Sequence, residues 1–317
     1  MILLVTNCRD ITTDYVVAEL KKRGVAYFRL NTEFLPQALC TMDAYPKNSW
    51  SISFGEKCIL GRNVGSAYFR RPGIPEAVHG TNEENYVEAE WVSFLKSLYA
   101  RLSGAWLNDP ANIFLAEDKP RQILIAHEIG LKVPFTKITN DLHVVKKTTE
   151  MGTTIGKPLR QALLAGEEEK VIFTTRLDEI RDEDAEAIAT APLIVQTEIV
   201  KKYDVRVTVV GERMFSTAIF SQVNEETQVD WRKNSRSDLE HIRIQLPNEI
   251  NEKCLELMRR LNLRYAAIDF ICDQQDKLWF LEVNPNGQWA WIENLTGYPI
   301  ASAIVDELEG IACEESN

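Results

Sequence analysis

The feature that most constrains the fold is a group of polar side chains on two apolar, strand-like segments near the end of the chain. Asp269 lies within Ala-Ala-Ile-Asp-Phe-Ile-Cys, and Glu282 and Asn284 lie within Phe-Leu-Glu-Val-Asn-Pro-Asn-Gly. Residues two apart on a strand point to the same side, so Glu282 and Asn284 project together. A carboxylate among apolar residues is costly unless its charge is balanced. The pattern predicts two neighbouring strands that bring three oxygen donors to one place.

Two interpretations of these donors remain open from the local sequence. Two carboxylates and an amide oxygen form an oxygen-only set, which suits Mg²⁺ because this ion takes few protein ligands and completes its shell with phosphates and water. The candidate metal ligands are therefore Asp269, Glu282 and Asn284. The alternative is a set of polar residues that caps a hairpin close to solvent.

Length and composition place the chain among globular proteins of more than one lobe. It has 317 residues, of which 45% are hydrophobic and 26% charged, and two or three lobes are expected at this length. No apolar run approaches the roughly 20 residues that span a bilayer, so no membrane partner is expected. The apolar start reads as a buried strand rather than a signal peptide. The net charge of −11 argues against a nucleic-acid partner.

The cysteines and histidines point to no structural metal. Six cysteines and four histidines are scattered, with no Cys-x-x-Cys pair, so a zinc site is not expected. Reduced thiols in a cytoplasmic protein are the simplest reading.

Hydrophobic periodicity and turn residues predict an α/β protein. The expected strands are 2–6, 25–30, 50–54, 66–69, 153–157, 193–199, 204–210, 214–221, 267–272 and 278–283. The expected helices are one capped by Thr13 or Asp14 and ending before Gly24, and others at 82–102, 115–129 and 249–261. A β-α-β order at the start indicates a small parallel-sheet lobe, and Gly211-Glu212 indicates a hairpin turn.

Other polar groups are ambiguous when each is taken alone. Asp204 and Arg206 begin a strand on one face, where they could bind a sugar diol and a phosphate, but an ordinary surface ion pair has the same pattern. Lys119, Lys157 and the segment Trp231-Arg232-Lys-Asn234 are equally ambiguous. Isolated lysines are usually solvated surface groups.

The order of these pieces resembles the ATP-grasp superfamily over the last two-thirds of the chain, and is most similar to the microviridin-type peptide ligases. These enzymes, also called graspetide synthetases, macrocyclise ribosomal peptides. The motifs behind the narrower similarity are Arg70-Arg71-Pro72, Leu107-Asn-Asp-Pro, Asp118-Lys119, Gly130-Leu-Lys-Val-Pro-Phe-Thr, Val229-Asp-Trp-Arg and Leu281-Glu-Val-Asn-Pro-Asn-Gly-Gln-Trp. The first lobe resembles the pre-ATP-grasp domain of that family.

The resemblance implies an ATP-grasp fold of three lobes. They are an N-terminal pre-ATP-grasp α/β lobe at 1–107, a central lobe at 108–192 and a C-terminal lobe with an antiparallel-sheet core at 193–317. It also implies site roles, all carried over by position. The residues that would bind ATP are Lys119, Lys157, Gln196, Glu198, Ile199 and Asp204. The catalytic residues would be Arg206, Arg232 and Asn234. Asp269, Glu282 and Asn284 would hold two Mg²⁺ ions. One departure is the loop 160–170, which has a single glycine and three acidic residues where a phosphate lid is expected.

The implied activity is an ATP-dependent ligation on a precursor peptide that carries a leader segment. An Asp or Glu side chain would become an acyl phosphate, and a Thr, Ser or Lys side chain would attack it to give an ω-ester or ω-amide. A homodimer is implied as well. The hairpin 206–221 and the adjacent helix are candidates for the leader dock, although a hairpin packed on the core would look the same. The alternatives are a ligase for a small molecule or a protein tail, and a non-catalytic module that kept the fold.

Overall fold

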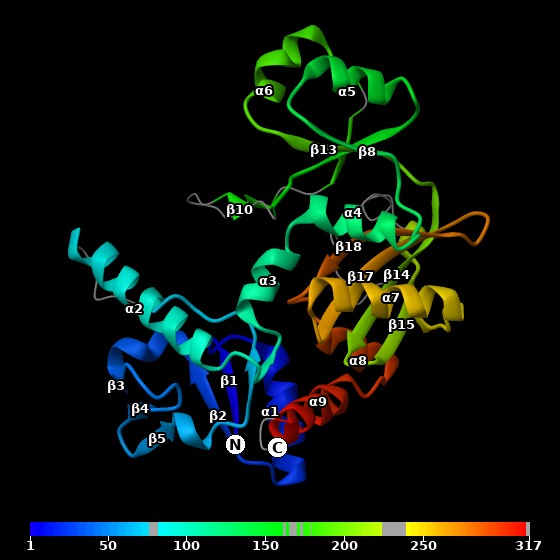
Figure 1. The fold of residues 1–317 in the computed structure, drawn as a ribbon. Coiled ribbons are helices and arrows are strands. Elements are labelled where there is room, and N and C mark those ends of the chain that lie inside the picture. The colour runs from blue at the N-terminus through cyan, green and yellow to red at the C-terminus, as the bar shows by residue number, and fades with distance from the viewer. Residues whose placement is uncertain are drawn as a thin grey trace.

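The computed structural model describes residues 1–75, 82–160, 163–164, 170–171, 174–177, 179–223 and 239–314. Figure 1 shows an N-terminal region in blue and cyan, a central region in green, and a C-terminal sheet in yellow-green to orange with its covering helix. The last helix, in red, returns to the N-terminal region, so the two ends of the chain lie near each other. This combination of helices with parallel and antiparallel sheets is the α/β class that the sequence predicts.

The N-terminal region is built on a parallel sheet with the strand order β2-β1-β6-β7. Its strands are β1 (Ile2–Thr6), β2 (Tyr27–Asn31), β6 (Ser66–Phe69) and β7 (Trp106–Leu107). Its helices are α1 (Ile11–Arg23) and α2 (Asn82–Arg101). All five residues of β1 are buried, because a central parallel strand is covered on both faces. The β-α-β start predicted from the sequence is confirmed.

The start of α1 differs from the prediction. The cap is Asp10, whose carboxylate accepts a hydrogen bond of 3.1 Å from the backbone N–H of Thr13. Thr13 and Asp14, which we expected to cap the helix, lie inside its first turn. Asp10 takes the role because its extended backbone, φ −77° and ψ 92°, lets a short carboxylate reach the N–H groups of the first turn.

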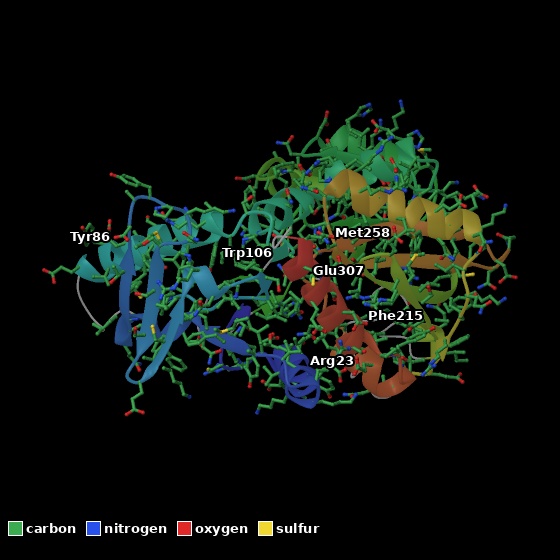
Figure 2. All side chains as sticks on the ribbon, turned by 60° about the horizontal axis from the view of Figure 1, so that its bottom comes forward. Arg23, Tyr86, Trp106, Phe215, Met258 and Glu307 are labelled. Carbon is green, nitrogen blue, oxygen red and sulfur yellow. The ribbon has the colours of Figure 1, made fainter. Side chains whose placement is uncertain are left out.

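A small antiparallel sheet, β3-β4-β5, completes this region and shares a core with α2. Its strands are β3 (Leu39–Met42), β4 (Trp50–Phe54) and β5 (Lys57–Leu60), and the 3₁₀ turns beside it are η1 (Thr32–Gln37) and η2 (Gly61–Asn63). The apolar residues Trp91, Phe94, Leu95 and Leu98 of α2 lie in this core. The outer end of α2 extends away from it, and Tyr86 there is 66% exposed (Figure 2).

The single helix expected at 115–129 is wrong, because two helices occupy this stretch. They are α3 (Pro110–Ala116) and α4 (Lys119–Glu128). Asp118 is extended, and its carboxylate accepts from the N–H of Arg121. Pro120 then occupies the first turn of α4, where its missing N–H costs nothing. The break leaves Lys119 at the start of a new helix.

The central region holds an antiparallel sheet with the order β12-β9-β13-β8. Its strands are β8 (Thr136–Thr139), β9 (Thr154–Lys157), β12 (Thr175–Arg176) and β13 (Leu193–Thr197), with a separate pair β10 (Leu163–Leu164) and β11 (Lys170–Val171). Its helical segments are α5 (Leu142–Thr149), η3 (Asp182–Asp184) and α6 (Ala185–Ala189). Because β13 pairs with both β8 and β9, we propose that the boundary predicted after residue 192 falls after Thr197 instead.

The C-terminal region is a five-stranded antiparallel sheet with the order β16-β15-β14-β17-β18. Its elements are β14 (Lys201–Val210), β15 (Arg213–Ile219), η4 (Ser221–Val223), β16 (His241–Arg243), α7 (Asn248–Leu261), β17 (Tyr265–Asp273) and β18 (Leu278–Asn284). The expected hairpin turn is confirmed, and Gly211 adopts φ 58° there. α7 packs on the sheet through a shared apolar core.

Two final helices, α8 (Ala290–Thr296) and α9 (Ile300–Glu314), connect the C-terminal sheet to the N-terminal region. Ile304 and Leu308 of α9 share a core with Ile2 and Leu4 of β1. At the edge of this core Arg23 of α1 pairs with Asp306 and Glu309 of α9. Figure 2 labels Arg23 on α1 and Glu307 on α9. Among the described helices, none has the length and apolar character needed to cross a membrane.

Candidate active site

The three predicted oxygen donors lie on one face of the strand pair β17–β18. Asp269 is the register partner of Glu282, and Ala267 is the partner of Asn284. Directly paired residues of antiparallel strands share a face, and so do residues two apart on one strand. A register shift between Asp269 and Phe270 marks a local irregularity beside the carboxylates. The structure therefore brings together the side chains that the sequence singled out, and their role as metal ligands stays a prediction.

Each of the two carboxylates has a cation beside it. Arg206 of β14 is the register partner of Asp269, and its Nη1 donates to Oδ1 and Oδ2 at 2.8 and 2.7 Å. Both side chains are buried, with 6% and 8% exposed. Lys119 Nζ lies 3.4 Å from Glu282 Oε2, and these side chains are 22% and 20% exposed. The negative charge of the pair of carboxylates is thus balanced by the chain itself.

Lys119 is held in place by Gln122, which the sequence reasoning missed. Gln122 is 2% exposed, and its side-chain amide pairs with the backbone of Val283, donating to the carbonyl at 2.8 Å and accepting from the N–H at 2.8 Å. Val283 lies between Glu282 and Asn284 on β18. The sequence did contain a signal for this role, because Gln122 is a polar residue three positions after Lys119 on the side of α4 that is buried. This contact fixes the helix that carries Lys119 against the strand that carries the donors.

The predicted ATP-binding residues of the central sheet form two polar pairs. Lys157 Nζ donates to Gln196 Oε1 at 2.7 Å, and Gln196 Nε2 donates to Thr136 Oγ1 at 2.8 Å. Gln196 is 2% exposed. Glu198 accepts two hydrogen bonds of 2.7 Å from Arg176, a residue that the sequence did not indicate. Ile199 follows β13 and is partly exposed.

Asp204 lies inside a polar group that sequence reasoning did not foresee. Lys201 Nζ donates to Asp204 Oδ1 and Oδ2 at 3.0 and 2.8 Å, and the Ser221 hydroxyl donates to Oδ2. Asp204 and Lys201 are 4% and 5% exposed. A ribose hydroxyl would have to donate to a carboxylate that already accepts from Lys201 and Ser221. The role of Asp204 in binding the ribose therefore stays a prediction.

Two predicted catalytic residues, Arg232 and Asn234, lie outside the described residues, as does most of the loop 160–170. Among the described residues, there is no group of three or more His, Cys, Asp or Glu side chains that could hold a metal ion. The candidate metal set is therefore two carboxylates with an amide oxygen.

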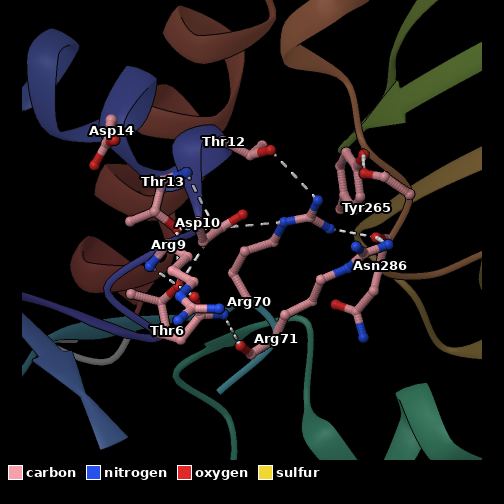
Figure 3. Close-up of polar contacts among 12 residues, drawn as sticks. Thr6, Arg9, Asp10, Thr12, Thr13, Asp14, Arg70, Arg71, Tyr265 and Asn286 are labelled. Carbon is pink, nitrogen blue, oxygen red and sulfur yellow. Dashed lines mark hydrogen bonds and ion pairs between the residues drawn. The ribbon is translucent and has the colours of Figure 1, made fainter. Parts of the chain in front are cut away.

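The N-terminal region contacts the loop that follows β18 through Arg70, which Figure 3 shows. The Arg70 side chain is 1% exposed, and its Nη1 donates to the carbonyl of Asn286. The same guanidinium lies 3.7 Å from Asp10 Oδ2 and donates to Thr12 Oγ1 at 3.5 Å. The arginine of the Arg-Arg-Pro motif thus connects α1 to the loop of the candidate metal residues.

Asn108 makes a second connection to this region. Its Nδ2 donates to the carbonyls of Tyr265 and Pro285 at 2.7 and 3.3 Å. Its Oδ1 accepts from the N–H groups of Arg264 and Tyr265 at 2.7 and 2.9 Å. The buried amide of the Leu-Asn-Asp-Pro motif therefore holds the start of β17 and the loop after β18 together.

Gly287 explains why this loop contains a glycine. A Cβ atom at this position would lie 2.4 Å from the Cβ of Ala267 and 3.0 Å from Arg206 Nη2. The Tyr265 hydroxyl donates to the carbonyl of Gly287 at 2.5 Å. Burial raises the pKa of Tyr265, so the phenol stays protonated and keeps this donor. The loop can lie against the Arg206–Asp269 pair only because residue 287 has no side chain.

Comparison with known proteins agrees with this arrangement. The family model described as the RimK-like ATP-grasp domain matches residues 116–308, which covers more than half of the chain. A search of curated proteins found no match.

Solved structures match nearly the whole chain. The RiPP-associated ATP-grasp ligase of Chryseobacterium gregarium, solved with ADP and a leader and core peptide, is 26% identical with a TM-score of 0.87, over 97% of this chain and 96% of that one. Macrocyclase MdnC of Microcystis aeruginosa MRC, bound to precursor peptide MdnA, is 27% identical with a TM-score of 0.83, over 98% and 99%. Macrocyclase MdnB of the same organism is 28% identical with a TM-score of 0.78, over 97% and 98%.

Proposed function

We infer the function of this chain from the premise that it belongs to the RimK-like ATP-grasp family and is an ATP-grasp ligase that uses ATP and Mg²⁺. It activates Asp or Glu side chains of a ribosomal precursor peptide as acyl phosphates and joins them to side-chain hydroxyls or amines of the same peptide. The products are ω-ester or ω-amide crosslinks, with ADP and phosphate released.

The observation that carries this proposal is the likeness to peptide ligases over the whole chain. The family model covers residues 116–308 and by itself does not distinguish a peptide substrate from a small one. The likeness to the Chryseobacterium ligase and to MdnC, both solved with peptides, extends over the N-terminal region as well. No observation favours a small-molecule or protein-tail ligase over this proposal.

The chemistry of the donor set fits magnesium. Asp269, Glu282 and Asn284 offer only oxygen atoms, and Arg206 and Lys119 balance the charge of the two carboxylates in the structure. We propose that these donors hold two Mg²⁺ ions. When bound, Mg²⁺ neutralises charge on the phosphate oxygens.

The remaining residues align the reactants. Lys119 and Lys157 would bind the phosphates, and the segment around Gln196, Glu198 and Ile199 would line the adenine, with Asp204 at the ribose. Arg206, Arg232 and Asn234 would stabilise charge that develops on the transferring phosphoryl group. Because such transfer depends mainly on alignment and charge stabilisation, a fixed array of cations is the contribution expected of the protein.

The test is a crosslinking reaction on the peptide encoded beside the ligase gene. Incubated with this chain, ATP and Mg²⁺, the peptide should lose the mass of one water per bond formed, and ADP should accumulate in step. The Glu249→Gln variant on the exposed face of α7 should react equally well. An unchanged peptide mass, with ADP formed on free amino acids instead, would contradict the peptide substrate.

Three further properties belong to the same proposal. The precursor binds through a leader segment, with the hairpin β14–β15 as its candidate dock, because the Chryseobacterium relative was solved with a leader peptide. The ligase is a homodimer, which light scattering at micromolar concentration would check. It works in the cytoplasm, which cell fractionation would check.

A further inference from the structure

The turn after β6 holds an arginine in an unusual backbone conformation. Arg71 has φ 46°, in the left-handed region that side chains other than glycine adopt at a cost of roughly 1 kcal/mol. Neighbouring contacts fix the turn on both sides. Asn7 Nδ2 donates to the carbonyl of Arg71 at 2.6 Å, and Thr32 Oγ1 donates to that of Gly73 at 2.6 Å. Glycine would adopt this conformation at a lower energetic cost. The presence of an arginine here therefore suggests that its side chain has a role.

The side chain of Arg71 reaches the loop of the candidate metal residues. Its Nη2 donates to the carbonyl of Asn286 at 3.5 Å, the same carbonyl that Arg70 contacts (Figure 3). The N–H of Asn286 in turn donates to Asn284 Oδ1 at 3.0 Å. Arg71, a cation from the N-terminal region, therefore contacts residue 286, which is two positions after the candidate metal ligand Asn284. The other candidate cations come from different parts of the fold, Lys119 from α4 and Lys157 from the central sheet.

The charge of Arg71 is compensated at longer range, by Asp10 and Glu117, rather than by a direct ion pair. Arg70 lies near Asp10, whereas no carboxylate of the described residues lies within 4.0 Å of Arg71. Part of the Arg71 side chain is open to solvent. Partial burial and the positive charge of Arg70 both lower the pKa of Arg71. Arg70 and Arg71 are adjacent, and Arg71 makes no direct ion pair with a described carboxylate, so this position favours the arrival of an anion.

The position also matches a general site for ligands in open parallel sheets. In the order β2-β1-β6-β7, strand β2 lies on one side of β1 and strand β6 on the other, so the strand order reverses direction at β1. Ligands of such sheets bind outside the carboxyl ends of the strands at this point. Arg70 and Arg71 directly follow the carboxyl end of β6.

We propose that Arg71 is a specificity-determining residue that binds the carboxylate of an acidic side chain of the peptide beside the candidate metal loop. The inference rests on the proposed function. A guanidinium suits this role because its planar donors match both carboxylate oxygens. Arg70, which is buried and engaged with Asp10, Thr12 and Asn286, holds the turn and the loop in position.

The experiment compares Arg71→Met and Arg71→Lys with the unchanged protein and with Arg62→Met, an exposed arginine of the same region. The probes are the peptide encoded beside the gene and versions in which each acidic residue is replaced by its amide. Arg71→Met should lower kcat/KM for the peptide about 10- to 100-fold, the loss of one charge-assisted contact. The KM for ATP should change less than about twofold, and Arg71→Lys should recover part of the activity.

Peptide binding, measured by fluorescence anisotropy, provides a readout that a merely structural residue would not change. In the unchanged protein one acid-to-amide replacement should weaken binding, and in Arg71→Met the same replacement should have no further effect. The inference would be overturned if the losses of peptide affinity from Arg71→Met and from the acid-to-amide replacement were additive. It would also be overturned if Arg71→Met weakened ATP binding as much as peptide binding, because that result marks a phosphate ligand. If the unchanged protein crosslinks the peptide and Arg71→Met does so equally well, only this inference fails. If the unchanged protein crosslinks nothing, the proposed function fails with it.

Discussion

The C-terminal sheet and the central sheet both carry residues assigned to ATP and Mg²⁺, but they differ in how firmly those residues are fixed. All nine residues of β17 are buried, and its Asp269 is paired with Arg206 in the interior. In the central sheet both residues of β12 are exposed, and Arg176 on it is 42% exposed where it pairs with Glu198.

This difference separates two tasks of the site. Charges that must not move during phosphoryl transfer are best held in a buried network, where neither partner can leave without cost. Contacts to a nucleotide that must enter and leave are better placed on short strands with solvent access, where an ion pair is worth little. The C-terminal sheet thus supplies a fixed platform, and the exposed strand β12 of the central sheet supplies an exchangeable contact, whereas Gln196 of the same sheet is buried.

The largest expected effect breaks the buried pair. Asp269→Asn leaves Arg206 charged in the interior without its carboxylate, so the free energy of unfolding should fall by about 3–5 kcal/mol. Lys119→Met, which removes the partly exposed partner of Glu282, should cost about 1 kcal/mol or less. Urea denaturation measures both. Equal losses would mean that the two pairs do not differ in the way that their burial indicates.

A large effect on activity with little effect on stability is expected for Glu282. Glu282→Gln keeps the shape of the side chain and removes its charge, so the rate of ADP formation should fall about 10²- to 10³-fold, as for loss of one preorganised electrostatic contact. Its urea midpoint should stay close to that of the unchanged protein. Glu249→Gln is the matched control on α7. Retained turnover in Glu282→Gln would contradict the metal assignment.

The smallest effect is expected in the central sheet. Lys157→Met should raise the KM for ATP about tenfold through the loss of one charged contact to phosphate, and kcat should change less. Lys137→Met, an exposed lysine of β8 in the same sheet, is the control. A loss in kcat as large as that of Glu282→Gln would show that the central sheet is as much a part of the fixed platform as β17.

Some parts of the fold were readable from the sequence and others were not. The strands 50–54 and 66–69 were predicted with their observed bounds, because alternating or apolar runs between turn residues are a local signal. The helix expected at 115–129 was wrong because the apolar periodicity continues through Glu117 and Asp118, and the side-chain cap of Asp118 ends it. Gln122 and Asn108 were missed as supports, since each acts on a distant backbone segment.

The sequence by itself determined the order and kind of chemical groups, and with them the family and the ligase activity, because motif spacing and strand alternation are properties of neighbouring residues. The tertiary structure decided which groups from distant segments meet. Arg206 and Asp269 are 63 positions apart, and Arg70 lies 216 positions from the carbonyl that it contacts. Such contacts depend on how whole segments pack, because packing determines which charges are buried together and which stay open to a substrate.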